Sequence, residues 1–573
     1  MKTERTSMAK WIMNLSTVLL FGIFALVALI MMKTGAVASA VLAAISAVTV
    51  VLLRVKFAAR YEKRISDQKG VFCFLVLMSM AALLWIGRSI SWNRWYSESY
   101  RSIVMFLLVA MLSLYFITTM IVWSGEKQLH RIYFPIALVM GIVFMMMLPA
   151  FQAPDEVVHA GTAYRLSNSI VGVENVDDLN YLKMREADAA YPKLTRDVTR
   201  EQREKVWDHL FEKTENTKIV KVNFPSLNTF PVQYLVPALG ISLGRAVGAS
   251  GATVFFLGRL FNLLFFVCLI TLAIKITPVG KNVMFMVALL PITIQQGMSF
   301  SYDVFLIVCA FLYIAEVFHW SESHLSLKTW SEWGHALLLV CSFVCLMVIK
   351  QHAYTPMALL LLMILVSHGK VDPQKLLKLV AGIVVLVMLL ICCAFVWCHF
   401  HPLAEPTNIL SYSGKPSYTI QHILNHPGDS ISVFGNTLID RTAFYYVSGI
   451  GSQLGWLDVP TNMITTIAFL PLLLAAPNMD SDEMKKKITG KQKALYLLIS
   501  LGCFGFTLFG MWTGWTPLGN ITVEGVQGRY FLPFMPLLLL AFTTGKIKID
   551  QSLSEVVPSV VIMLDIIAIT SLM

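Results

Sequence analysis

Long apolar runs of about 17–25 residues recur along nearly the whole sequence. A helix of that length crosses roughly 30 Å of hydrocarbon, and a segment inside a bilayer must satisfy its backbone hydrogen bonds within itself. Hydrophobic residues make up 57% of the 573 residues and charged residues only 14%, which is too little charge to cover a soluble protein of this size. We therefore expect an all-α polytopic membrane protein.

The apolar runs predict about 13–15 transmembrane helices. They lie near residues 11–32, 35–53, 71–87, 103–124, 132–150, 253–275, 282–298, 304–320, 335–349, 353–368, 379–399, 461–477, 494–513, 529–545 and 556–572. The expected organisation is a four-span module (1–130), a membrane core (131–400) with a helical external loop (151–252), a second external segment (401–460) and C-terminal spans (461–573).

Basic residues in the short loops assign the sides of the membrane. Arg54, Lys56 and Arg60 and their neighbours follow the second span, and Lys127 and Arg131 follow the fourth. Short loops rich in lysine and arginine stay in the cytoplasm, so the N-terminus is expected inside and the chain is expected to leave the fifth span outside. These basic residues orient spans, and we do not expect a nucleic-acid partner.

The segment 230–248 decides the side of every later loop. If it crossed the membrane, the lysine-rich segment 477–493 would lie outside, which disagrees with the positive-inside rule. Two prolines and Arg245 also argue against a regular span. We therefore predict an external helix that lies on the membrane. Residues 151–228, with 13 acids and 11 bases, have the composition of a small soluble domain.

With this topology, unusual polar residues gather at the external ends of spans, where buried charge usually marks a functional site. The catalytic candidates are the adjacent acids Asp155 and Glu156, just after the fifth span. The substrate-binding candidates are His159, Arg165, Asp303, Lys350, Gln351, His352, Arg441, Gln527, Arg529 and Tyr530.

Each group also has a structural interpretation. Arg529 and Lys350 could be anchors that reach the lipid headgroups, and Asp303 could cap the helix that follows it. Glu156 and His159 have the i, i+3 spacing of some metal sites, but one such pair alone does not predict a metal. A functional interpretation fits the whole set, since cations can hold a lipid phosphate while a nearby carboxylate acts as a general base.

Several stretches in order, among them "APDEVVHAGTAYRLSN", "ALLPITIQQGMSFSYDVFLI", "LGWLDVP" and "VQGRYFLPFMPLLLLA", resemble the bacterial membrane-protein family called domain of unknown function 2142. The resemblance covers about residues 130–545, and that family looks like a branch of the GT-C superfamily of polytopic glycosyltransferases. It implies an inverting transferase in the bacterial plasma membrane, active on the outer face. It also implies that Asp155 is the base and that Asp303 is the second acidic element.

The expected reaction moves a sugar from a polyprenyl-phosphate donor to an envelope polysaccharide, wall polymer or glycolipid, beside the lipid bilayer. The resemblance leaves a divalent cation open as a cofactor. The alternatives are a flippase or transporter of lipid-linked polysaccharide and a polysaccharide polymerase. Transporters usually show internal repeats and ionisable residues at the bilayer midplane, whereas the charges here gather at one end of the spans.

Overall fold

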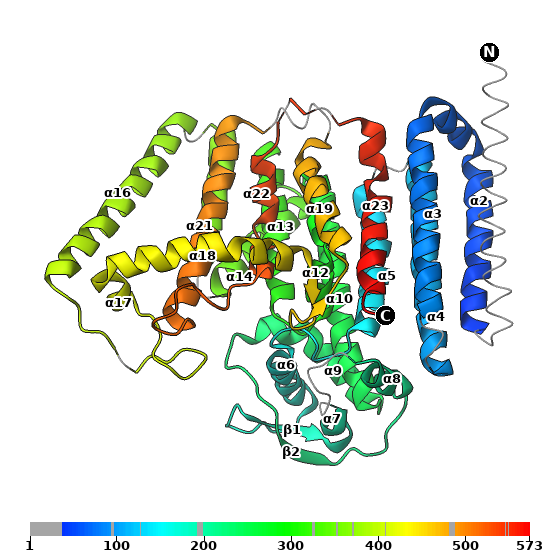
Figure 1. Ribbon diagram of the computed structural model, residues 1–573, viewed down its shortest axis with the longest axis horizontal. Coiled ribbons are helices and arrows are strands. Elements are labelled where there is room, and N and C mark those ends of the chain that lie inside the picture. The colour runs from blue at the N-terminus through cyan, green and yellow to red at the C-terminus, as the bar shows by residue number, and fades with distance from the viewer. Residues whose placement is uncertain are drawn as a thin grey trace.

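The computed structural model describes residues 37–573 except 93–96, 126–127, 192–198, 324–326, 351–352, 370–371, 407, 481–487, 545 and 548. The first predicted span, near 11–32, lies outside these residues. The helices and strands of the described chain are nearly all α-helical, with two small antiparallel pairs of strands, as the apolar runs predict. Figure 1 shows the long helices side by side, with a small domain at one end of the bundle.

The N-terminal module contains α2 (Val37–Asp67), α3 (Lys69–Trp92) and α4 (Glu98–Trp123). The helix α5 (Leu129–Met147) leads to a small domain, which we call the external domain after the side of the membrane predicted for it. It consists of α6 (Glu156–Val171), β1 (Tyr181–Arg185), α7 (Glu186–Ala190), α8 (Arg200–Asp208), β2 (Ile219–Asn223), η3 (Pro231–Tyr234) and α9 (Leu235–Ala246).

The membrane core continues with α10 (Gly251–Ile276), α11 (Lys281–Ala288), α12 (Pro291–Met298), α13 (Asp303–Glu322), α14 (Trp330–Val348), η4 (Thr355–Leu361), α15 (Leu362–Ser367) and α16 (Pro373–Phe400). After it come α17 (Ile420–Asn425), α18 (Pro427–Ile450), β3 (Gln453–Leu454), β4 (Val459–Pro460), α19 (Met463–Ala475), η5 (Ala476–Asn478), α21 (Gly490–Gly514), η6 (Gly528–Phe531), α22 (Met535–Ala541) and α23 (Gln551–Thr570).

Among the described residues, eight helices are long and apolar enough to cross a membrane: α2, α3, α4, α5, α10, α13, α14 and α21. Several predicted spans are instead broken. The run 282–298 forms α11 and α12, because Pro291 follows Leu290 and the residue before a proline is driven into extended backbone (φ −61°, ψ 139°). The run 529–545 contains two prolines and forms only η6 and the short α22.

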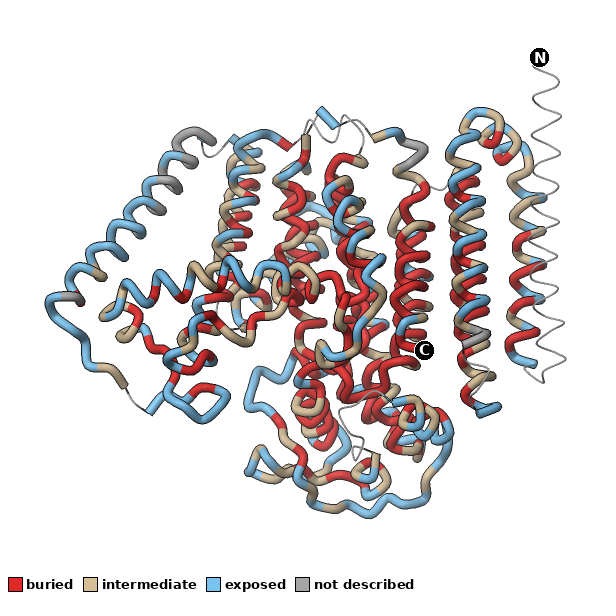
Figure 2. Tube along the Cα trace, in the orientation of Figure 1, coloured by how far each residue is buried: buried red, intermediate tan, exposed pale blue. Residues whose placement is uncertain are grey.

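At the packed centre of the bundle α10 contacts both α5 and α13, whereas the described side chains of α16 are mostly exposed (Figure 2). Figure 1 places the α2–α3 turn and the start of α21 at the end of the bundle opposite the external domain. This is the relative placement that the lysine-rich loops predict. The helix α18 runs across the other long helices instead of along them.

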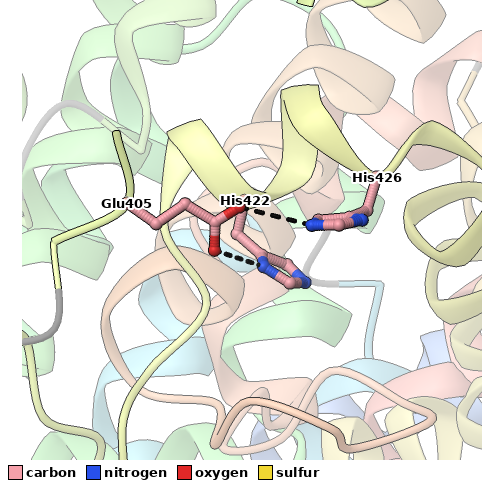
Figure 3. Close-up of side chains that lie close together, drawn as sticks. All are labelled: Glu405, His422 and His426. Carbon is pink, nitrogen blue, oxygen red and sulfur yellow. Dashed lines mark hydrogen bonds and ion pairs between the residues drawn. The ribbon is translucent and has the colours of Figure 1, made fainter. Parts of the chain in front are cut away.

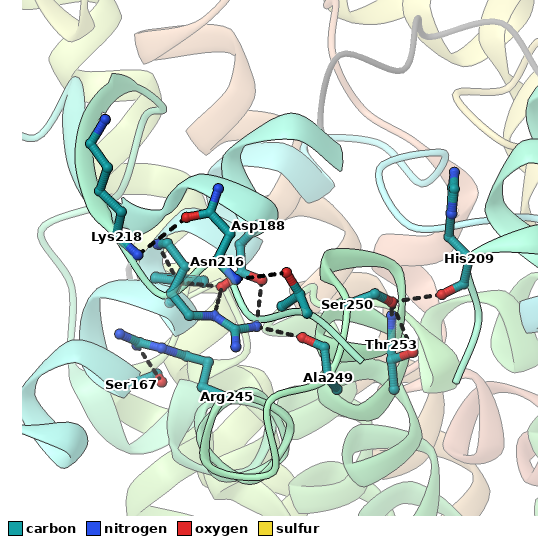
Figure 4. Close-up of polar contacts among 12 residues, drawn as sticks. Ser167, Asp188, His209, Asn216, Lys218, Arg245, Ala249, Ser250 and Thr253 are labelled. Carbon is teal, nitrogen blue, oxygen red and sulfur yellow. Dashed lines mark hydrogen bonds and ion pairs between the residues drawn. The ribbon is translucent and has the colours of Figure 1, made fainter. Parts of the chain in front are cut away.

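The external domain confirms that 230–248 does not cross the bundle. The 12-residue α9 packs against α6 and α10. One polar network, part of which Figure 4 shows, fastens the domain together. The Arg185 guanidinium donates to both Asp188 carboxylate oxygens (2.7 and 2.8 Å) and to the Ala249 carbonyl (2.8 Å). Arg245 donates to Ser167 and Asn168 on α6, at 2.9 Å each.

Candidate functional site

Four charged side chains from distant parts of the chain meet where the external domain joins the bundle. The Lys350 ammonium lies 2.7 Å from Asp303 Oδ1, and the Arg529 guanidinium lies 3.5 Å from Asp303 Oδ2. The other end of Arg529 lies 3.5 Å from Asp155 Oδ2. We call Asp155, Asp303, Lys350 and Arg529 the charged cluster. Its carboxylates and cations alternate, so Asp303 holds the two cations side by side.

Each member of the charged cluster lies where the chain begins or leaves a helix. Asp155 precedes α6, and Asp303 is the first residue of α13. Lys350 follows α14, and Arg529 belongs to η6, before α22. Asp155 and Lys350 both have left-handed backbone (φ 59° and 53°), a costly conformation that is held only by surrounding structure and is frequent at functional sites.

Within the charged cluster, Asp155 is the member most exposed to water. The Asp155 side chain is 57% exposed, whereas those of Arg529 and Asp303 are 4% and 6% exposed. Arg529 Nη1 is buried and has no hydrogen-bond partner among the described residues. Burial opposes the charge of Arg529, but Tyr530, Asp303 and Asp155 together raise its pKa. The arrangement therefore offers a permanent buried cation with spare hydrogen-bonding capacity beside an accessible carboxylate.

Aromatic rings surround the Lys350 ammonium. It lies 3.7 Å from the centre of the Tyr530 ring and 5.3 Å from that of Tyr302, both within the range of cation–π attraction. Burial would lower the pKa of Lys350, but Asp303 and the two tyrosines raise it. Lys350 is thus a fixed cation and not a snorkelling anchor. Asp303 pairs with both Lys350 and Arg529 and is not the N-cap of its helix.

Glu156 points away from its neighbour Asp155 and is fully buried. One oxygen accepts from the backbone N–H groups of Phe151 and Ala153 (2.8 and 3.1 Å). The other accepts from Phe300 N–H (3.1 Å) and lies 3.0 Å from the Arg259 guanidinium. With both oxygens engaged, Glu156 fastens the segment before Asp155 to the segment before Asp303. Its geometry is that of a positioning residue, and we do not place it among the groups that contact substrate.

His159 lies one helical turn after Asp155 and faces a different partner from Glu156. Its Nδ1 is 2.7 Å from the Tyr234 hydroxyl, and its ring meets the edge of Tyr302 at 5.1 Å. Burial lowers the pKa of His159 to about 4; Asp303 opposes this shift, while Arg529 and Lys350 add to it. The ring is thus neutral at physiological pH, and the i, i+3 pair with Glu156 does not converge on a metal position.

Of the remaining predicted residues, two lie in or beside the charged cluster, two lie away from it and two fall outside the described residues. Tyr530 contacts Lys350, and Gln527, whose side-chain oxygen is buried without a hydrogen-bond partner in the described structure, directly precedes η6. Arg165, on α6, donates to the Val176 carbonyl and holds a loop of the external domain. Arg441, on α18, donates to the Thr522 hydroxyl (3.2 Å). Gln351 and His352 lie outside the described residues.

Sequence reasoning missed two residues that shape the site. Arg259 lies fully buried in the first half of the apolar helix α10 and pairs with Glu156; it also donates to the Leu148 carbonyl (2.6 Å). A charged residue inside a predicted span is by default paired, and that signal was available. Tyr302, next to Asp303, separates His159 from Lys350.

Comparison with known proteins identifies a family but no activity. The search of curated proteins and the search of solved structures each found no match to this chain. A family model described as "Predicted membrane protein (DUF2142)" matches residues 138–538, which contain the whole charged cluster and most of the chain. The chain therefore belongs to the family of predicted membrane proteins called domain of unknown function 2142.

Proposed function

We propose that the protein is a membrane glycosyltransferase of the GT-C type, which moves a sugar from a polyprenyl-phosphate donor to a cell-envelope acceptor on the outer face of the bacterial plasma membrane. One observation carries the proposal: the accessible Asp155 carboxylate lies 3.5 Å from the buried Arg529 guanidinium, at the end of the bundle. A lipid-anchored phosphate would lie near the ends of membrane-spanning helices, and arginine is the side chain best suited to hold it.

The donor phosphate would engage Arg529 and Lys350. Arg529 has the unpartnered Nη1 to offer, and its 3.5 Å contact with Asp155 is too long for a strong charge-assisted hydrogen bond. A phosphate that binds Arg529 therefore competes with Asp155. Once Arg529 turns to the phosphate, the exposed Asp155 oxygens are free to accept a hydrogen bond from the acceptor hydroxyl. Donor binding would thus make Asp155 available as the base.

The transfer step couples removal of a proton from the acceptor to loss of polyprenyl phosphate from the donor. Asp155 takes the proton of the acceptor hydroxyl, and the hydroxyl oxygen forms a bond to the anomeric carbon of the sugar. On the opposite face, the bond from that carbon to the phosphate oxygen breaks, and its electron pair leaves with polyprenyl phosphate. Arg529 and Lys350 meet this added negative charge, which is the usual means by which fixed cations stabilise such a transition state. Attack from the opposite face inverts the configuration.

A divalent cation does not fit the donor set of the charged cluster. Both Asp303 oxygens already face cations, and Glu156 is engaged with Arg259 and backbone N–H groups. Asp155 would be the one acidic ligand left, while Mg²⁺ or Ca²⁺ needs several oxygen ligands. The side chains alone would therefore carry the transfer step.

The test uses the full-length protein in liposomes with a panel of polyprenyl-phosphate hexoses and an envelope extract as acceptor source. We expect the wild type to release polyprenyl phosphate and Asp155→Asn to do so at least about 100-fold more slowly, the usual contribution of a general base. Asp177→Asn, an exposed acid of the same domain, is the matched control and should leave the rate unchanged.

A binding measurement separates the two roles. Asp155→Asn should bind polyprenyl phosphate at least as tightly as the wild type, because Arg529 loses a competing carboxylate, while Arg529→Lys should bind it more weakly. Sugar donor that crosses the bilayer intact, without release of polyprenyl phosphate, would refute the transferase and support a flippase. Near-normal release of polyprenyl phosphate by Asp155→Asn would show that Asp155 is not the general base.

A further inference from the structure

A second group of ionisable side chains lies in the external segment between α16 and α18, away from the charged cluster. The Glu405 carboxylate lies 2.7 Å from His422 Nδ1 and 3.3 Å from His426 Nε2 (Figure 3). The two imidazole rings have their centres 4.4 Å apart. One ligand atom from each residue lies within 4.8 Å of the others. We call Glu405, His422 and His426 the His–Glu cluster.

The local fold brings the His–Glu cluster together. His422 lies in α17, and His426, four residues later, lies at the junction with α18, so both rings project from one face. Asn425 fastens Glu405 to this junction: its amide donates to Glu405 Oε1 (2.9 Å) and to the Leu403 carbonyl (2.8 Å), and its oxygen accepts from Leu403 N–H (2.8 Å). The carboxylate is thus held in place from a second segment of chain.

We propose that the His–Glu cluster binds a divalent transition-metal ion, with Zn²⁺ as the best fit. Two imidazoles and one carboxylate suit zinc and not Mg²⁺ or Ca²⁺, which take oxygen ligands. Two histidines at i, i+4 near a helix are a known zinc arrangement. Ligand atoms around a tetrahedral zinc are about 3.3 Å apart, given bonds of about 2.0–2.1 Å. The 3.3 Å between Glu405 and His426 already matches that spacing, whereas the 2.7 Å contact between Glu405 and His422 would lengthen, and any separation near the 4.8 Å limit would shorten.

The exposure of the three side chains leaves room for a fourth ligand. His422 is 17% exposed, Glu405 32% and His426 48%. A water molecule can complete the tetrahedron from the open side, and the ion can enter from the same side. Both imidazoles already face the carboxylate, so each would exchange its contact with Glu405 for a bond to the metal.

The metal ion would join the exit of α16 to the start of α18. Residues between these helices also contact the segment that leads to η6: Leu518 N–H donates to the Pro416 carbonyl (2.8 Å), and Tyr418 hydroxyl donates to the Asn520 carbonyl (2.9 Å). The metal would therefore hold the second external segment against the chain that carries Arg529. This role does not depend on the proposed transfer reaction.

The test is isothermal titration of ZnCl₂ into the full-length, tag-free protein in detergent after treatment with a chelator. We expect one Zn²⁺ per chain and a higher midpoint of thermal unfolding with the metal bound. His422→Ala, His426→Ala and Glu405→Gln should each weaken binding more than about tenfold. Asn425→Ala keeps all three ligands but removes the support of Glu405, and should weaken binding about tenfold or more.

His209→Ala is the matched control. His209 is exposed and lies 2.9 Å from Glu212, so it forms the same kind of His–carboxylate pair without a second histidine. Its replacement should leave the titration unchanged. The proposal is overturned if the wild type takes up no Zn²⁺, or if binding persists in the His422→Ala/His426→Ala double variant. Because binding and unfolding are measured without donor or acceptor, this outcome is independent of whether the protein transfers sugar.

Discussion

Replacement of Asp303 by asparagine tests the charged cluster most directly. The change keeps the shape of the side chain and removes the negative charge that lies between Lys350 and Arg529. At an effective dielectric constant of about 20, unit charges 2.7 Å apart attract by about 6 kcal/mol and charges 3.5 Å apart by about 5 kcal/mol. Most of this attraction offsets the cost of burying the charges, so the net effect is smaller.

The measurable loss follows from the two cations left behind. Breaking a buried ion pair by removing one partner typically costs about 3–5 kcal/mol. Asp303, Lys350 and Arg529 are 6%, 15% and 4% exposed, so water can screen little of the remaining repulsion. We expect Asp303→Asn to lower the free energy of unfolding by about 3–5 kcal/mol.

A double-mutant cycle isolates the interaction from other effects of the mutation. Lys350→Met removes one cation, and Asp303→Asn/Lys350→Met removes the bridging pair as a neutral unit. The double variant should be about 2–3 kcal/mol more stable than the sum of the two single losses implies, as for other residues in direct contact. The assay is unfolding in mixed micelles titrated with sodium dodecyl sulfate, followed by tryptophan fluorescence.

An exposed ion pair supplies the control. Glu174 lies 3.3 Å from Lys183 in the external domain, with its side chain 89% exposed, so Glu174→Gln should change stability little. A coupling energy near zero between Asp303 and Lys350 would show that their contact does not organise the site. It would refute the role of Asp303 as a carboxylate shared by two cations.

Three further predictions use the same unfolding assay. A Cβ at Gly528 would lie 2.2 Å from the backbone of α18, so Gly528→Ala should cost about 1–3 kcal/mol or more and weaken polyprenyl phosphate binding through displacement of Arg529. Gly510→Ala is the control: a Cβ there meets no atom within 4 Å, and alanine favours the interior of α21, so stability should stay unchanged or rise by up to about 1 kcal/mol. The pKa of His159 falls from 6.5 to about 4 on folding, so between pH 6.5 and 4 the unfolded chain binds more protons than the folded chain. The free energy of unfolding should therefore fall by up to about 3 kcal/mol as the pH drops from 6.5 to 4. His159→Gln should lose this pH dependence. Glu156→Gln should cost about 3–5 kcal/mol, because it leaves its guanidinium partner buried without a counter-charge; a loss below about 1 kcal/mol would argue against the positioning role.

The fold could be predicted where it follows from segment length and charge. Apolar length predicted the helical bundle, and the lysine-rich loops placed 230–248 outside it, where α9 now packs. The breaks within the predicted spans escaped prediction, because a proline acts on the local backbone, whereas hydropathy averaged over many residues still shows an apolar run. The long helix α18 also escaped prediction, since its sequence mixes apolar and polar residues without the length of a pure apolar span.

The site could be predicted in its members but not in their orientation. Asp155 and Glu156 are neighbours, yet one faces water beside Arg529 and the other is buried against Arg259. Successive residues of a helix point about 100° apart, and Asp155 lies in left-handed backbone just before the helix, which separates the two side chains further. Spacing alone therefore could not assign the two acids different roles, and it could not show that Arg441 turns toward Thr522.

The position of the four charges at chain turns explains how 374 residues can separate Asp155 from Arg529 in a single site. A charge in the middle of a span needs a partner at the same depth, whereas a charge at the end of a helix is placed by the length of that helix. Asp155, Asp303 and Lys350 each lie at such an end, and Gly528 lets α18 contact the backbone beside Arg529. A change in the second external segment should therefore act first on Arg529, and so on donor affinity, while leaving Asp155 in place.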